Sequence, residues 1–199
     1  MGPPRYILPA LLGAVLFTPV LSSPAMSADK ANEELRMAIE QNDVAAMKSA
    51  LSQGAGVNAQ FSHGSTALML AAEAGDINIA RTLLARGADI HSRCGCGWTV
   101  LMHAAAGGDN VTMLQLLMAH GAAVNEKTSR KRPQNGLQTA LQAAAFFGSA
   151  ANTRFLLAQG ATVNMTNAQG ETALQIALKS KHTSGDVVSL LKAAAAKEQ

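Results

Sequence analysis

Two cysteines separated by one glycine, Cys94-Gly95-Cys96, are the residues of this sequence best suited to chemistry. The pair could close a small, strained and reducible disulfide ring, or bond to a cysteine of a partner. The thiols could also stay free and bind a metal, helped by His91 and by His63, which aligns with Cys96 one repeat earlier. Four-coordinate sites usually draw on two such pairs or on added histidines. We therefore expect a disulfide, and neither a resident metal nor a cofactor.

The other histidines and the acidic residues do not form a catalytic pattern. His103 replaces an aliphatic residue of the repeats described below, which places it near the core with its ring nitrogens satisfied locally. The sequence has no nucleophile elbow with a Ser/His/Asp order, no glycine-rich phosphate loop and no HExxH motif. Acidic residues occur one or two per repeat, as turns and caps require. We predict that the protein is not an enzyme.

Composition excludes several classes of protein. The chain has 199 residues and a formal charge of +3, but only 15% of its residues are charged and 48% are hydrophobic. Such a chain is neither disordered nor a polybasic arm. Aromatic residues make up 4%, too few for the stacking platforms of single-strand binders. Nucleic acid is therefore not expected as a partner.

Residues 1–28 have the pattern of a secretory signal peptide. Arg5 precedes an apolar stretch over residues 6–21, and small residues follow, so that cleavage is expected near 25–28, after Ala25 or after Ala28. An uncleaved membrane anchor is the alternative, but the apolar run is short and contains two prolines. We expect a periplasmic or secreted protein with no stable membrane anchor after cleavage.

The body of the chain repeats two phrases. The first begins at Thr66, Thr99, Thr139 and Thr172, as in Thr-Ala-Leu-Met-Leu-Ala-Ala at residues 66–72. The second is Leu-Leu followed by Gly-Ala, as in residues 83–88, 116–122 and 156–161. Thr66 and Thr99 are 33 residues apart, as are Thr139 and Thr172.

Each unit predicts two helices that cannot stand alone. After Thr66, the residues Leu68, Ala71 and Ala72 recur at helical spacing, and a second apolar helix ends at Gly87, a suitable left-handed cap. One helix pair buries little, so its stability must come from stacking on neighbours. Charged residues make a polar cap of the first pair, at about 31–53, and of the last helix.

The repeated phrases resemble the ankyrin repeat, with its 33-residue period and T-P-L-H-x-A signature. Here Ala or Val replaces the proline, and Met or Gln replaces the histidine; a tetratricopeptide array would lack the Gly-Ala-x-Val-Asn corner. The resemblance implies an all-α solenoid of stacked helix-turn-helix pairs joined by β-hairpin loops. It would cover residues 29–199, with an N-cap repeat at 30–58 and repeats at about 59–91, 92–125, 126–164 and 165–196.

The same resemblance implies a concave surface that binds one partner protein, with the chain itself monomeric. The partner would be stabilised, inhibited (as by an immunity factor) or scaffolded. The family's variable contact positions fall on the hairpin tips, before each Thr and after each Ala-Ala pair: Phe61, Ser62, His63, Ser65, Glu73, Ala74, Gly95, Cys96, Trp98, Ala106, Gln138, Phe146, Phe147, Glu171 and Lys179. Four of the five aromatic residues after residue 28 are among them. The alternative function is a redox- or metal-responsive module centred on Cys94 and Cys96.

One connection is longer than the others and basic. The residues between Asn125 and Gly136 form a finger that carries Lys127, Arg130, Lys131 and Arg132. A solvated loop would explain it, but such a local field could also steer an acidic patch of a partner. Without Arg5 and the finger, the chain is close to neutral.

Overall fold

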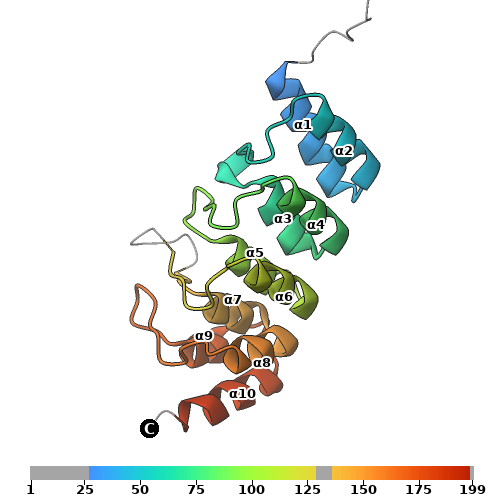
Figure 1. The fold of residues 1–199 in the computed structure, drawn as a ribbon. Helices are drawn as coiled ribbons and strands as arrows, with labels where there is room; N and C mark the ends of the chain where they lie inside the picture. The colour runs from blue at the N-terminus through green and yellow to red at the C-terminus, as the bar shows by residue number, and fades with distance from the viewer. Residues whose placement is uncertain (1–26, 129–135, 198–199) are drawn as a thin grey trace, which may run out of the picture.

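The computed structural model describes residues 27–128 and 136–197, which form an elongated stack of helix pairs (Figure 1). The all-α solenoid expected from the repeats is confirmed. Within these residues, inner helices follow one another along the stack: α1 (Ala28–Glu40), α3 (Ala67–Ala74), α5 (Val100–Ala106), α7 (Ala140–Phe147) and α9 (Ala173–Lys179). An outer helix pairs with each of them: α2 (Val44–Ser52), α4 (Ile77–Ala85), α6 (Val111–Ala119), α8 (Ala150–Ala158) and α10 (Gly185–Ala195).

The repeated threonine marks the start of each inner helix from α3 onward. The hydroxyls of Thr99, Thr139 and Thr172 each accept a hydrogen bond from the backbone N–H three residues later. Such a cap satisfies one of the amides that a helix leaves open at its first turn. Two of these helices end at a left-handed glycine, Gly75 (φ 80°) and Gly148 (φ 82°), a conformation that glycine adopts without steric cost.

Alanine lets the inner helices approach one another closely. Helix α5 contacts α3 on one side and α7 on the other, and α7 also contacts α9. Most alanines of these helices are fully buried, among them Ala71, Ala72, Ala104, Ala105, Ala143, Ala144 and Ala145. Larger fully buried side chains, including Met69, Leu83, Met102, Met113 and Leu117, complete the same core. In the described residues no helix is long and apolar enough to cross a bilayer.

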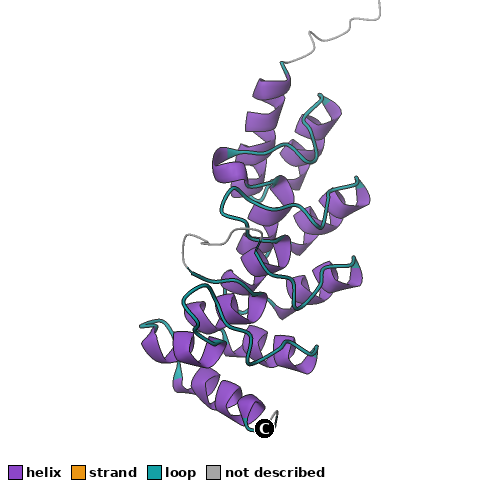
Figure 2. Cartoon of the chain, turned by 90° about the vertical axis from the view of Figure 1, so that its left-hand side faces the viewer, coloured by secondary structure: helices purple, strands orange, loops and turns teal. Residues whose placement is uncertain are grey.

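The connections between repeats are hairpin-like loops that lie along one side of the stack (Figure 2). One backbone hydrogen bond closes each loop, from Phe61 N to Ser65 O (2.8 Å), Cys94 N to Trp98 O (3.1 Å), Thr128 N to Gln138 O (3.0 Å) and Asn167 N to Glu171 O (2.9 Å). Within the described residues only two loops carry a β-bridge, a single one each, between Gln60 and Thr66 and between Arg93 and Thr99. The loops are therefore hairpins without extended strands.

A polar side chain of the following repeat completes the end of each of three inner helices. Asn110 Nδ2 donates to Ala72 O of α3 (2.9 Å), and Asn152 Nδ2 donates to Ala105 O of α5 (3.3 Å). At the next junction Thr183 Oγ1 donates to Ala145 O of α7 (2.6 Å). Carbonyls in the last turn of a helix have no intrahelical partner, and burial without one is costly. The caps therefore bind each repeat to the one before it.

The Val-Asn corner noted in the sequence performs a similar task near the outer layer. Asn58 accepts from Asp89 N (2.8 Å) and donates to Gly87 O (3.2 Å) of the next repeat. Asn125 accepts from Thr162 N (2.8 Å) and donates to Gly160 O (3.0 Å). Each amide thus pairs with both kinds of backbone group one repeat further on, which fixes the register between neighbours.

Two large apolar side chains are exposed in the first and last inner helices. Leu178 of α9 is 60% exposed, at the position equivalent to Ala72, Ala105 and Ala145, which following repeats cover. Met37 of α1 is 45% exposed. On the same helix, Arg36 forms ion pairs with Glu33 and Glu40 on successive turns.

We predict that Asn152→Ala lowers the free energy of unfolding by about 2–4 kcal/mol, because the amide of Asn110 and the carbonyls of Ala105 and Gly108 would lose a buried partner. The control is Asn125→Ala, which removes equivalent bonds at an exposed site where water can replace them; its cost should stay below about 1 kcal/mol. Urea unfolding followed by circular dichroism measures both. Equal losses would contradict the role given to burial.

Candidate functional site

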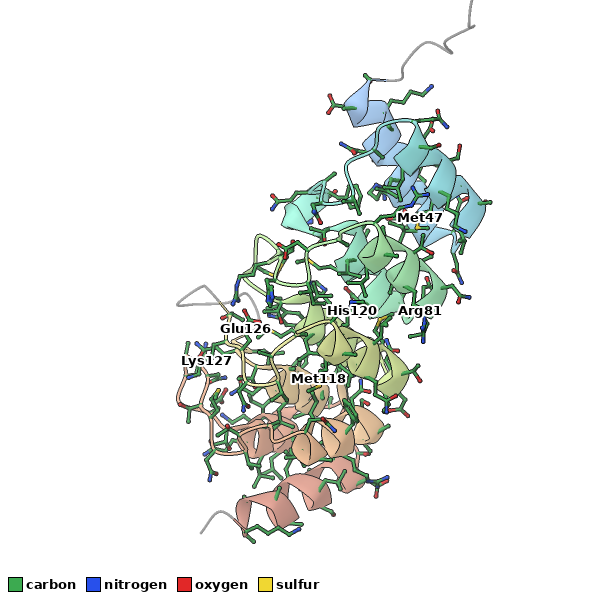
Figure 3. All side chains as sticks on the ribbon, viewed as in Figure 1. Met47, Arg81, Met118, His120, Glu126 and Lys127 are labelled. Atoms are coloured by element: carbon green, nitrogen blue, oxygen red, sulfur yellow. A yellow bond between two sulfur atoms is a disulfide. The ribbon has the colours of Figure 1, made fainter. Side chains whose placement is uncertain are left out.

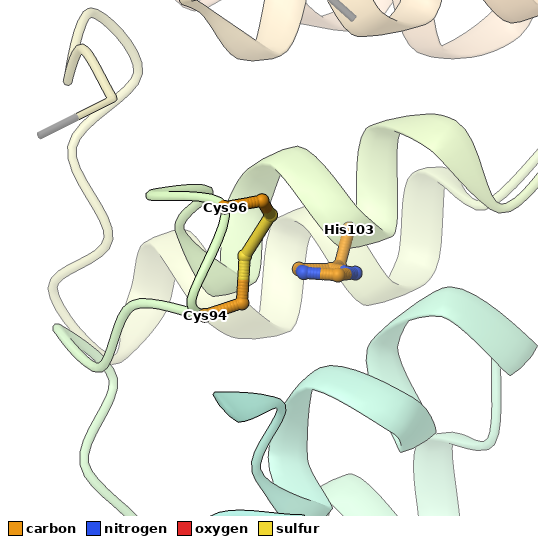
Figure 4. A group of neighbouring side chains, drawn as sticks. All are labelled: Cys94, Cys96 and His103. Carbon is orange, nitrogen blue, oxygen red and sulfur yellow. A yellow bond between two sulfur atoms is a disulfide. The ribbon is translucent and has the colours of Figure 1, made fainter. Parts of the chain in front are cut away.

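The two cysteines are bonded to each other at the tip of the hairpin that precedes α5 (Figure 4). Cys94 is buried and Cys96 is half-buried. The sequence left open a disulfide within the chain, a disulfide with a partner, and free thiols. The structure contains the disulfide within the chain. Gly95 between them is required by close packing: its N–H donates to His63 O (2.7 Å), and a Cβ at Gly95 would lie only 2.7 Å from that oxygen.

His103 lies one turn into α5, beside the disulfide (Figure 4). Its ring is buried, with Nδ1 3.0 Å from Oε2 of Glu73 in the preceding repeat. Nε2 is buried and has no hydrogen-bond partner, so the expectation that both nitrogens are satisfied is wrong for Nε2. A second difference concerns the neighbours of the cysteines: in the described residues the histidine grouped with the two sulfurs is His103, whereas His63 and His91 are exposed elsewhere in the hairpins.

Electrostatics fixes the protonation pattern of this pair. The hydrogen bond from His103 holds the pKa of Glu73 below its ordinary value, against the opposing effect of partial burial. An ionised carboxylate can only accept, so Nδ1 of His103 is the donor in this hydrogen bond. Nε2 is thus buried without a hydrogen-bond partner, on a ring that has one nitrogen within 4.8 Å of both sulfur atoms.

A line of aromatic rings runs from this hairpin toward the next repeat, and we call Trp98, Phe146, Phe147 and His182 the aromatic ridge. Trp98 contacts His103 (5.5 Å between ring centroids) and Phe147 (6.5 Å), both edge-on. Phe147 contacts Phe146 edge-on (5.1 Å), and Phe146 lies 6.3 Å from His182. Phe147 is 41% exposed, whereas Trp98 is 8% exposed. The placement of Trp98 on the free surface is therefore corrected: it supports Phe147 from below.

The other predicted contact residues are spread over several repeats. Ser62, His63, Glu73, Ala74 and Lys179 are exposed, and Phe61, Ser65, Cys96, Ala106, Gln138, Phe146 and Glu171 are half-buried. Phe61 packs against the core from the first hairpin, away from the aromatic ridge. Glu171 forms an ion pair with Lys179, and its bonds with Lys179 and Asn167 lower its pKa. Glu73 and Ala74, with Ile39 and Leu70, bound a hollow of about 320 Å³ between α1 and α3.

The base of the basic finger is attached to the cysteine hairpin by Arg93. This side chain forms an ion pair with Glu126 and donates to Lys127 O (2.8 Å) and Gly97 O (3.3 Å). Lys127 is exposed, and Figure 3 shows it with Glu126 on the loop side of the stack. The other predicted cations of the finger, Arg130, Lys131 and Arg132, lie outside the described residues. Sequence reasoning did not find the Arg93–Glu126 pair, because the two residues are one repeat apart.

A second hollow, of about 450 Å³, lies on the outer layer between α8 and α10. Its lining includes Arg154, Leu157, Val163 and Leu190. None of the residues predicted as contacts lies in it, so it is separate from the aromatic ridge.

Comparison with protein families gives two overlapping matches. A family model described as ankyrin repeats in three copies matches residues 101–198, and one described as ankyrin repeats in many copies matches residues 69–118. Together they cover the cysteine hairpin, the aromatic ridge and the rest of the stack from α3 onward. A search of curated proteins found no match.

Proposed function

Because the chain belongs to the ankyrin-repeat family, whose repeats generally bind proteins and are typically non-catalytic, we propose that it is an exported adaptor that holds one partner protein on its concave face. The exposed ring of Phe147 is the observation that carries this proposal. Phe147 is the second residue after the buried alanines of α7, where the resemblance places a contact position of the repeat.

The surroundings of Phe147 suit it to be an anchor. Trp98 and Phe146 contact its ring from two sides, so the ring is held before a partner arrives. A large aromatic side chain with few rotatable bonds loses little conformational entropy on binding, and such residues dominate the energy of protein interfaces. An apolar side chain of the partner would pack on the exposed part of Phe147.

Charge supplies the second element of recognition. Lys127 is exposed at the base of the finger, and Arg130, Lys131 and Arg132 follow it in the sequence. Arg93 fixes this base to the neighbouring hairpin, so the cations start from a defined place beside the concave face. A partner with an acidic patch would be steered toward this end of the surface. Whether the chain stabilises, inhibits or scaffolds this partner depends on which protein the partner is.

Export is the third part of the proposal. Ser27 caps α1, since its hydroxyl accepts from Lys30 N (3.4 Å), and Ala28 is the first residue of that helix. Cleavage after Ala25 keeps this cap, whereas cleavage after Ala28 removes it. A disulfide between Cys94 and Cys96 also suits an oxidising compartment.

We expect N-terminal sequencing of the chain recovered from the cell envelope to give Met26 as the first residue, with the Ser27 cap retained. A start at Ala28 or Asp29 would move the cleavage site, and a start at Met1 would contradict export by this signal.

For the binding surface, Phe147→Ala should weaken capture of the partner at least about tenfold, because it removes an anchor of the kind that dominates interface energies. The purified chain is used to capture proteins from envelope extract, and quantitative mass spectrometry compares the variants.

The matched control is Leu178→Ala, which removes an exposed apolar side chain from the end of the stack. The partner should be a protein that is retained by wild type and by Leu178→Ala but lost with Phe147→Ala. If no captured protein depends on Phe147, the proposed surface is wrong.

A further inference from the structure

We propose that Cys94, Cys96 and His103 form, once the disulfide is reduced, a binding site for one thiophilic metal ion, Cu⁺ or Zn²⁺. The site adjoins the aromatic ridge through Trp98, and it needs no partner protein. It differs from the metal site considered from the sequence alone, in which His63 and His91 were the helpers.

The three ligand atoms are already gathered. The two sulfurs and one nitrogen of His103 lie within 4.8 Å of one another, and all three residues are buried or half-buried. A cation with bonds of about 2.3 Å to sulfur and about 2.1 Å to nitrogen needs its ligand atoms within about 4 Å of one another. After reduction, the two sulfurs would move apart to this spacing and toward the ring nitrogen by rotation of the freed cysteine side chains.

The unpartnered nitrogen is what points to a ligand. Nδ1 of His103 is taken by Glu73, which leaves Nε2, buried and without a hydrogen bond. Figure 4 shows one ring nitrogen on the side of the disulfide and the other facing away. Burying a polar atom without a partner costs free energy, and a metal ion at this position would use its lone pair.

The neighbours of the ligands are those that metal sites use. A carboxylate on the far nitrogen of a ligating histidine orients the ring and raises its basicity, and Glu73 holds this position. The backbone N–H of Trp98 donates a hydrogen bond to Cys94 Sγ (3.3 Å), and such a bond stabilises negative charge on the sulfur of a thiolate. Gly95 holds the hairpin tip against His63 by a backbone hydrogen bond, independently of the disulfide.

The chemistry requires a reductant, for which we name a dithiol. It transfers two electrons and two protons to the Cys94–Cys96 bond, giving two thiols, and is itself oxidised to a disulfide. Binding of the cation then replaces both thiol protons, which leave to solvent, and two sulfur–metal bonds form. The disulfide and the metal-bound form need the same two sulfur atoms, so the two states exclude each other.

The donor set limits the choice of cation. Two thiolates and an imidazole select soft or borderline ions. Cu⁺ is satisfied by three such ligands, whereas Zn²⁺ would need a fourth, supplied by water because the group found in the described residues has three members.

The experiment uses the full chain, reduced with dithiothreitol and desalted without oxygen, beside the oxidised chain. Native mass spectrometry gives the stoichiometry with Zn²⁺ and with Cu⁺. Competition with a chromophoric chelator gives the affinities, and Co²⁺ in place of Zn²⁺ reports thiolate ligation by its charge-transfer absorption. We expect one ion per reduced chain and none per oxidised chain. Binding of one Cu⁺ or one Zn²⁺ per reduced chain supports the site. If both ions bind, the higher affinity identifies the preferred cation.

Variants separate the three-ligand site from a simple pair of thiols. His103→Leu restores the residue found at the equivalent position Leu70, so the oxidised variant should keep its fold, as judged by circular dichroism. It should bind the metal at least about tenfold more weakly, and Glu73→Ala should weaken binding about tenfold. The control His91→Ala removes an exposed histidine of the same hairpin and should change nothing. Wild-type affinity in His103→Leu, or no metal bound by the reduced chain, would overturn the proposal.

Discussion

Each inner helix depends on the next repeat for its packing and for its hydrogen bonds. Ala104 and Ala105 of α5 are buried because α3 and α7 lie against them, and the carbonyl of Ala105 accepts a hydrogen bond from Asn152 of the following unit. A single pair would leave both the apolar face and the helix end exposed. Leu178 of α9, at the position equivalent to Ala105, is not covered by any described repeat and is 60% exposed.

This dependence also builds the functional features. The stack fixes α5 relative to its neighbours, so His103 reaches Glu73 in the repeat before, and Trp98 reaches Phe147 in the repeat after. Arg93 joins the cysteine hairpin to the base of the basic finger in the same way. The Glu73–His103 and Trp98–Phe147 contacts therefore depend on neighbouring repeats, and neither would form in an isolated helix pair.

The sequence predicted the architecture well because a 33-residue period reports a repeated local structure. It predicted the site less well, because residues at equivalent positions of two repeats lie on different hairpins and need not be neighbours in space. His63 aligns with Cys96 but lies on another hairpin, whereas His103 lies on the helix that follows its own hairpin and faces the sulfurs. Trp98 looked like a contact residue by position, yet rings from two repeats cover it. Such differences depend on how side chains pack between neighbouring repeats, and the repeated sequence motif gives no information about that packing.

Native-state hydrogen exchange, read by mass spectrometry helix by helix, measures the coupling between repeats most directly. If every repeat relies on its neighbours, the amides of α5 and α7, covered on both sides, should exchange most slowly, and those of α1 and α10 fastest. Equal protection of all helices would contradict this, as would an end helix more protected than α5.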